Sequence, residues 1–150
     1  MIYLDSSALV KRYIEESGSS RVTALLAESD VAAVSRLAYA EALSALTRRH
    51  KAGDISTRSF EKIKPAFKSD WDRLLIIELG IEVWGFVDRI IARHALKAAD
   101  SIHLSTALML KQKLKTELIF IASDIELLAA AQKEKLKIIN PVLKPELQSY

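Results

Sequence analysis

Short apolar runs alternate along this chain with longer segments in which apolar residues recur every three or four positions. The short runs are rich in Ile, Val and Leu and predict strands at 2–4, 31–34, 74–77, 118–122 and 137–139. The longer segments predict helices at 8–14, 21–28, 36–51, 56–69, 81–94, 99–113 and 125–135. Because strands that alternate with helices pair through right-handed crossovers, the pattern predicts an α/β/α sandwich around a mainly parallel sheet.

Polar residues and prolines refine these boundaries. Either Ser6 or Ser7 is expected to cap the first helix, and Ser35 is expected to cap the third. Pro65 should kink or divide the helix over 56–69, because proline removes a backbone donor and clashes with the preceding turn. The tail after Pro141 is the segment expected to be loose.

At 150 residues the chain is expected to form a single domain over 1–150 with one buried core. Half of the residues are hydrophobic, but no run approaches the roughly 18 to 20 apolar residues that span a bilayer, so no membrane partner is expected. No secretory signal is expected at the N-terminus, and the chain has no cysteine. These features favour a cytoplasmic location without disulfides or thiolate metal sites.

The formal net charge of +3 and the pI near 9.1 are compatible with a polyanionic partner. Basic residues fall in short groups at 11–12, 48–51, 111–115 and 133–137. Most of them fit solvated helix faces and ends, so charge alone is weak evidence for nucleic-acid binding.

Two aspartates follow predicted strands and precede predicted helices. Asp5 comes directly after the first strand, and Asp124 comes two residues after the fourth. In a parallel sheet both emerge at the carboxyl edge, where open α/β folds bind their ligands. Each also fits a helix cap, a common role of Asp, but the repeated context favours a shared site.

Two further carboxylates lie on predicted inward helix faces. Glu41 has apolar and small neighbours one turn away, and a buried unpaired carboxylate costs several kcal/mol. It therefore needs a cation, a hydrogen-bond network or a metal, with a structural arginine salt bridge as the alternative. Asp100 begins an inward stripe with His103 and Leu104, and helix capping is its alternative role.

Residues close to these carboxylates have supporting or open roles. Ser6 and Ser123 suit hydrogen bonds that orient carboxylates. His103 is expected to be packed and hydrogen-bonded rather than a ligand, and Glu126 is expected to be exposed. Participation of either residue in the site is left open.

Four converging carboxylates would repel one another strongly, since one pair about 4 Å apart costs roughly 4 kcal/mol at an effective dielectric near 20. Such a site must be protonated or filled by a metal. Oxygen ligands favour Mg²⁺ or Mn²⁺ over zinc. The matching chemistry is phosphodiester hydrolysis by metal-activated water, with the metal also stabilising the leaving oxygen.

The residues around these carboxylates also resemble a known family. The segments are YLDSSALVKRY over 3–13, Glu41 in its helix, LKAADSIHLSTA over 96–107, and FIASD over 120–124. In order and spacing they resemble the four acidic motifs of PIN-domain proteins, and most closely those of VapC-type toxins of toxin-antitoxin pairs. The first and third motifs are specific, whereas an isolated glutamate is not.

The resemblance implies a PIN fold and an endoribonuclease that depends on Mg²⁺ or Mn²⁺. It implies metal-site and catalytic roles for Asp5, Glu41, Asp100 and Asp124, and a supporting polar role for Ser123. It further implies RNA as the substrate, a homodimer, and inhibition by a VapB-type antitoxin whose C-terminal segment occupies the active-site groove. Residues 56–79 match the family least, which leaves the choice of RNA open.

Other functions compete with this interpretation. A phosphatase or receiver-type domain would use a strand-end Asp as phosphoryl acceptor, but Ser7 stands where a dehalogenase-type site needs a second Asp. A non-catalytic RNA- or protein-binding module would use the basic groups alone, yet an acidic pocket repels RNA unless metal fills it. Neither a P-loop nor the nucleophile elbow of a Ser/His/Asp hydrolase is visible.

Overall fold

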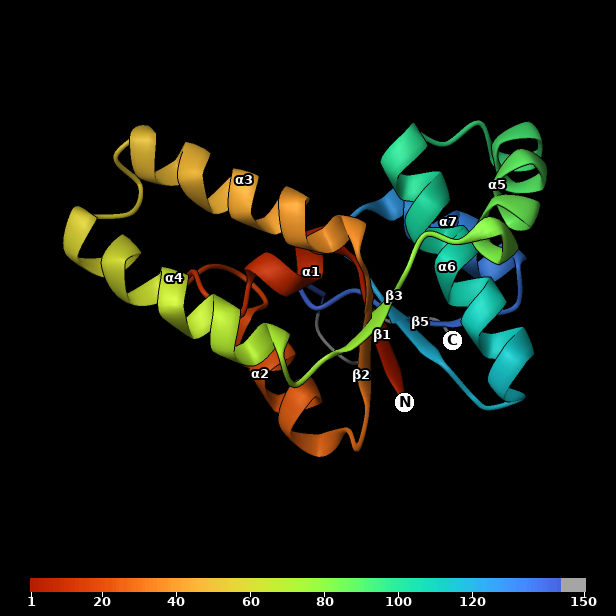
Figure 1. Ribbon diagram of the computed structural model, residues 1–150, viewed down its shortest axis with the longest axis horizontal. Helices are drawn as coiled ribbons and strands as arrows, with labels where there is room; N and C mark the ends of the chain where they lie inside the picture. The colour runs from red at the N-terminus through yellow and green to blue at the C-terminus, as the bar shows by residue number, and fades with distance from the viewer. Residues whose placement is uncertain (144–150) are drawn as a thin grey trace.

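A five-stranded parallel sheet forms the centre of the protein in the computed structural model, which describes residues 1–143 (Figure 1). The strands are β1 (Ile2–Leu4), β2 (Ala32–Ser35), β3 (Leu75–Ile77), β4 (Ile119–Ile121) and β5 (Lys137–Ile139). Their order is β3-β2-β1-β4-β5, and every neighbouring pair is parallel. The sheet predicted as mainly parallel is therefore parallel throughout.

The sheet has its topological switch point beside β1. From β1 the chain winds outward through β2 to β3, and then crosses back to place β4 on the other side of β1. Tyr3 pairs with Ala33 of β2 and with Phe120 of β4. Open α/β sheets bind ligands beyond the carboxyl ends of the strands at such a point. Asp5 directly follows β1 at this position.

Helices cover both faces of the sheet. Figure 1 shows α1 (Ser6–Val10), α2 (Ser19–Glu28), α3 (Leu37–Lys51) and α4 (Thr57–Trp71) on one side. On the other side lie α5 (Ile81–His94), α6 (Ala98–Leu114) and α7 (Ile125–Lys133). Each helical layer has its own buried apolar cluster against the sheet. The arrangement is the predicted α/β/α sandwich.

Alternation along the short strands supplies both clusters. Ile2 and Leu4 belong to the cluster under α1–α4, whereas Tyr3 between them belongs to the cluster under α5–α7. This follows from the period of two along a strand. The Tyr3 ring stacks on Phe120, with centroids 5.5 Å apart and planes 9° from parallel. Full burial of one such side chain stabilises the fold by roughly 1.5–3 kcal/mol.

Two predicted helix caps are wrong. Asp5, not a serine, caps α1, because its carboxylate accepts a hydrogen bond from the Ala8 backbone N–H at 2.8 Å. The helix also ends at Val10 rather than residue 14. Ser35 is the last residue of β2, and its hydroxyl accepts a hydrogen bond at 3.0 Å from the N–H of Leu37, the first residue of α3. The α3 cap position is Arg36, which makes no side-chain capping bond.

Pro65 does not divide its helix, since α4 runs unbroken over 57–71. A proline inside a helix costs about 3 kcal/mol. Packing of the same helix offsets this cost, because Phe67 is buried against the Tyr13 and Tyr39 rings and Trp71 packs edge-on against Tyr39. From residue 144 onward, the tail predicted to be loose lies outside the described residues.

No helix within residues 1–143 combines the length and apolar character needed to cross a membrane.

A buried ion-pair cluster joins the end of α5 to the end of α7. His94 Nε2 lies 2.8 Å from Glu134 Oε1, and the two side chains are only 5% and 8% exposed. Arg93 and Arg89 also reach the Glu134 carboxylate, at 3.2 and 3.8 Å. Burial works to raise the pKa of Glu134, but the His94 hydrogen bond and the two guanidinium groups outweigh it, and the pKa is lowered.

We expect Glu134→Gln to reduce the free energy of unfolding near pH 7 by about 1.5–3 kcal/mol, the usual worth of a hydrogen bond to a charged group. Because the folded-state pKa of Glu134 lies below its unfolded value, this contribution is present above the unfolded pKa and is lost as pH falls through the folded one. Urea unfolding of both proteins from pH 7 to pH 3 measures the difference. Glu117→Gln, which removes an exposed partner of Lys137, should leave stability unchanged. A pH-independent gap between wild type and Glu134→Gln would contradict the prediction.

Candidate functional site

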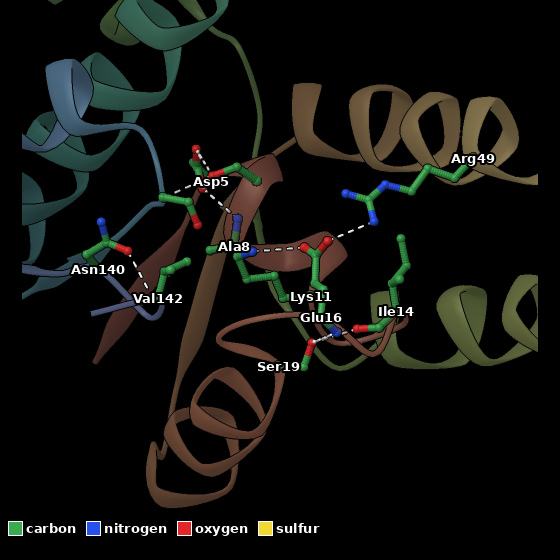
Figure 2. Close-up of polar contacts among 11 residues, drawn as sticks. Asp5, Ala8, Lys11, Ile14, Glu16, Ser19, Arg49, Asn140 and Val142 are labelled. Atoms are coloured by element: carbon green, nitrogen blue, oxygen red, sulfur yellow. Dashed lines mark hydrogen bonds and ion pairs between the residues drawn. The ribbon is translucent and has the colours of Figure 1, made fainter. Parts of the chain in front are cut away.

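Asp5 is a buried carboxylate at the end of the central strand. Its side chain is only 3% exposed. The Ala8 backbone N–H donates to Oδ1 at 2.8 Å (Figure 2). The Ser7 hydroxyl lies 2.8 Å from both carboxylate oxygens. These donors come from the first turn of α1, which begins where β1 ends. The strand-to-helix junction therefore fixes the position of the carboxylate.

Burial raises the pKa of Asp5 to about 6. The nearby His103 and the hydrogen bonds from Ala8 and Ser7 oppose this shift, while the Asp100 carboxylate adds to it. A buried carboxylate with a negative neighbour is stabilised by a bound cation or by a proton. Asp5 thus has the electrostatic character expected of a metal ligand.

Asp124 lies across the switch point from Asp5, beyond β4. It caps α7, because its Oδ1 accepts a hydrogen bond from the Leu127 N–H at 2.9 Å. The preceding residue, Ser123, donates its backbone N–H to the Ser7 hydroxyl at 3.0 Å. One serine thereby links the segment after β1 to the segment after β4.

Glu41 of α3 is held by a histidine rather than by an arginine. His103 Nε2 donates to Glu41 Oε2 at 2.6 Å, and Nδ1 of the same ring faces the Tyr3 hydroxyl at 3.3 Å. His103 is 1% exposed, and the Glu41 side chain is 27% exposed. Burial works to raise the pKa of Glu41. The hydrogen bond and electrostatic interaction with His103, together with a hydrogen bond from Ser6, outweigh burial and lower this pKa overall.

Asp100 is half-buried in the first turn of α6 and does not cap the helix. The cap position is Lys97. Burial and the Asp124 carboxylate raise the pKa of Asp100, while His103 and Lys97 oppose the shift and Glu41 adds to it. Together with its effect on the Asp5 pKa, this couples Asp100 to all three other carboxylates. Asp100 is thus the carboxylate that interacts with every other member of the predicted set.

The donor set fits a hard divalent cation. Its members are oxygen ligands, and burial together with repulsion from Asp124 and Glu41 raises the pKa of Asp100. As the side chains lie, however, no three His, Asp or Glu side chains within residues 1–143 are close enough together to coordinate one ion. Asp5, Asp124 and Glu41 are each engaged by protein donors instead. Their assignment as metal ligands stays a prediction.

A cleft of about 780 Å³ opens beside these residues. Part of its lining belongs to the predicted site, namely Glu41, Ser6, Ser7 and Ser123. Another part is basic and consists of Lys11, Arg48 and Arg49. The cleft therefore joins an acidic end to a basic wall.

Sequence reasoning missed Ser7 and Tyr3. Ser6 and Ser123 are the predicted supporting serines, and Ser6 does hydrogen-bond to Glu41, but it is Ser7 that is hydrogen-bonded to Asp5. A serine two residues after a strand-end Asp was the available signal, since hydroxyls at that spacing bond locally. No sequence signal linked Tyr3 to His103, 100 residues away. His103 is packed and hydrogen-bonded and Glu126 is exposed, both as expected.

The chain matches a known family. The model of the PIN domain matches residues 2–133, and the chain belongs to the PIN-domain family. Nucleases of this family are typically metal-dependent.

Within the family, the chain is homologous to the VapC ribonucleases. It is 33% identical over 108 residues to Ribonuclease VapC45 and to Ribonuclease VapC49 of two Mycobacterium tuberculosis strains. Each alignment covers 72% of this chain and 75% of the relative. Phosphatase and receiver-type alternatives are therefore not supported.

Solved structures share the fold at lower identity. FitAcB from Neisseria gonorrhoeae aligns with a TM-score of 0.67 at 18% identity, covering 94% of this chain and 98% of that chain. VapBC2 from Rickettsia felis, bound to a DNA fragment from their promoter, aligns with a TM-score of 0.64 at 17% identity, covering 93% and 98%. These likenesses concern the fold.

We expect Ser7→Ala to lower the free energy of unfolding by about 1–2 kcal/mol, because it leaves the Ser123 N–H without its acceptor and removes a donor from the buried Asp5. Thermal and urea unfolding measure the effect. Ser20→Ala, at an exposed serine of α2, is the matched control and should leave stability unchanged. Equal stability of Ser7→Ala and wild type would show that this serine does not bridge the two segments.

Proposed function

We propose that this protein is a metal-dependent endoribonuclease and the toxin of a VapBC-type toxin-antitoxin pair. The observation that carries the proposal is the buried Asp5 carboxylate at the switch point of a PIN-domain sheet, where the Asp100 carboxylate adds to the rise in its pKa. The VapC relatives, which are named ribonucleases, support RNA as the substrate.

In this proposal Asp5, Asp100 and Asp124 hold Mg²⁺ or Mn²⁺, with Glu41 as the fourth carboxylate. When bound, such an ion lowers the pKa of a coordinated water and stabilises charge on a phosphodiester oxygen. A preference for Mg²⁺ or Mn²⁺ follows from the all-oxygen donor set.

The neighbouring side chains would orient this set. Ser7 holds the Asp5 carboxylate by hydrogen bonds to both oxygens. His103 holds Glu41, and the Tyr3 hydroxyl in turn faces His103. The Ser123 hydroxyl is buried and makes no hydrogen bond in the described structure, which leaves it available to a bound group. Such supporting contacts typically change metal affinity or activity by about 10- to 100-fold.

The proposal extends to partners and location. A toxin of this type pairs with a VapB-type antitoxin, and relatives of the same fold include a toxin-antitoxin complex from Klebsiella pneumoniae. A homodimer and a cytoplasmic location, where cellular RNA is found, complete the proposed assignment.

We expect Asp5→Asn and Asp100→Asn each to reduce RNA cleavage by about 100-fold or more and to abolish growth arrest on expression. Asn also caps helices, and it removes a charge that costs free energy when buried, so the Asp5→Asn protein should be at least as stable as wild type. Cleavage of total RNA, growth curves and thermal unfolding give the three readouts.

EDTA should abolish cleavage by the wild type, and added Mg²⁺ or Mn²⁺ should restore it. Glu126→Gln is the matched control, because this exposed carboxylate lies only two residues after Asp124. It should cleave like wild type. Full activity of either Asn variant, or cleavage undiminished by EDTA, would overturn the proposed function.

A further inference from the structure

Two basic groups that are distant in the sequence meet in the cleft beside the predicted metal site. Lys11 directly follows α1, whereas Arg48 and Arg49 lie in the last turn of α3. We call these three residues the cationic wall. Lys113 and Lys137, by contrast, form exposed ion pairs with Glu82 and Glu117.

A single carboxylate, that of Glu16, binds two members of the wall. Its Oε1 lies 2.8 Å from Lys11 Nζ, and its Oε2 lies 2.7 Å from Arg49 Nη1. Figure 2 shows Lys11 and Arg49 approaching this carboxylate from opposite sides. Burial works to raise the pKa of Glu16, but the hydrogen bonds from Lys11 and Arg49 outweigh it and lower the pKa. Glu16 therefore stays charged and holds both cations.

The loop that carries Glu16 is itself fixed. The Glu16 N–H donates to the Ser19 hydroxyl at 3.0 Å, and that hydroxyl donates to the Ile14 carbonyl at 2.6 Å. Gly18 has φ of 92°, and a Cβ there would meet the Pro141 carbonyl oxygen at 2.9 Å, so a side chain does not fit. The positions of Lys11 and Arg49 are thus set before any ligand arrives.

Helix-end electrostatics do not account for this arrangement. The dipole of α3 favours basic residues in its last turn. The dipole does not explain why the Lys11 side chain is buried in the cleft, where it is only 9% exposed. Burying an ammonium group costs several kcal/mol unless it is paired, and Glu16 supplies the pairing. Three cations and this one carboxylate still leave an excess of two positive charges on the wall.

The wall continues the face of α3 that carries Glu41. Ser44, Ala45, Arg48 and Arg49 follow Glu41 at the spacings i+3, i+4, i+7 and i+8, and all five line the cleft. Seven residues of helix correspond to about 10 Å. The arginines of the cationic wall therefore lie about 10 Å along the cleft from Glu41, a distance that a short run of nucleotides spans.

We propose that the cationic wall binds backbone phosphates of a single-stranded RNA on one side of the phosphodiester to be cleaved. This inference rests on the proposed function and adds the position of the strand. The cleft volume is in the range of small-ligand pockets, which suits one strand rather than a duplex. Guanidinium and ammonium groups bind phosphate oxygens, and Glu16 acts as a positioning residue.

The test measures binding of a labelled unstructured RNA oligonucleotide by fluorescence anisotropy across a series of salt concentrations. Asp100→Asn serves as the parent so that RNA is not cleaved. Adding Arg48→Gln or Arg49→Gln should weaken binding about fivefold near 0.1 M salt and lower the slope of log affinity against log salt by about 0.7. Arg49→Lys, which keeps the charge, should restore the slope. Lys113→Met on the exposed surface of α6 is the matched control and should leave both quantities unchanged.

Arg48 is exposed, with one hydrogen bond to Ser44, so its variant should fold even if a change at the buried Lys11 does not. Unchanged affinity and slope in both folded arginine variants would overturn the inference. Binding of labelled poly-glutamate is measured in the same variants. If they lose binding to poly-glutamate but keep their affinity for RNA, the inference is also overturned, because the wall would then bind an acidic peptide. Wild type is assayed in parallel for Mg²⁺-dependent cleavage. Absence of cleavage, with binding that still depends on the wall, would refute the proposed function while supporting the wall.

Discussion

Burial of the Asp5 carboxylate at the end of the central strand is the constraint around which this protein is organised. A charge that is 3% exposed costs several kcal/mol unless its surroundings stabilise it. The first turn of α1 supplies two donors, through the Ala8 N–H and the Ser7 hydroxyl. Ser7 then binds the Ser123 N–H, which joins the end of β1 to the end of β4. Stabilising one carboxylate thus also aligns the two segments that carry Asp5 and Asp124.

The same constraint explains the role of His103. Its presence lowers the pKa of Asp5, opposes the rise in the pKa of Asp100, and lowers the pKa of Glu41, to which it is hydrogen-bonded. The imidazole lies one helical turn beyond Asp100, and its ring is packed against Tyr3 from β1. A single buried histidine therefore holds α3, α6 and β1 around the predicted metal site.

Helix α3 carries both acidic and basic residues of the cleft, and α1 separates the basic Lys11 from the buried Asp5. Asp5 and Lys11 flank α1, which has only five residues, and Glu41 and Arg49 lie two turns apart on one face of α3. These short, fixed separations place opposite charges in one cleft. The charges do not pair with each other, because Glu16 binds Lys11 and Arg49 while His103 binds Glu41. A polyanion would meet the basic wall at a set distance from the acidic residues.

The sandwich, the parallel sheet and the motif positions of Asp5, Glu41, Asp100 and Asp124 could be predicted from the sequence, because apolar periodicity and strand-end placement are local properties. The sequence also placed Glu41 and Asp100 on inward faces. Local signals failed where neighbours in space decided the outcome, as in the continuous α4 through Pro65, which aromatic packing stabilises.

The contact of Glu41 with His103, 62 residues away, and the sharing of Glu16 by Lys11 and Arg49 arise from the folded structure and could not be predicted from the sequence. Sequence spacing sets which residues face the interior. Partners that are distant along the chain are set by how the sheet brings its layers together, because hydrogen bonds and ion pairs depend on distances in space.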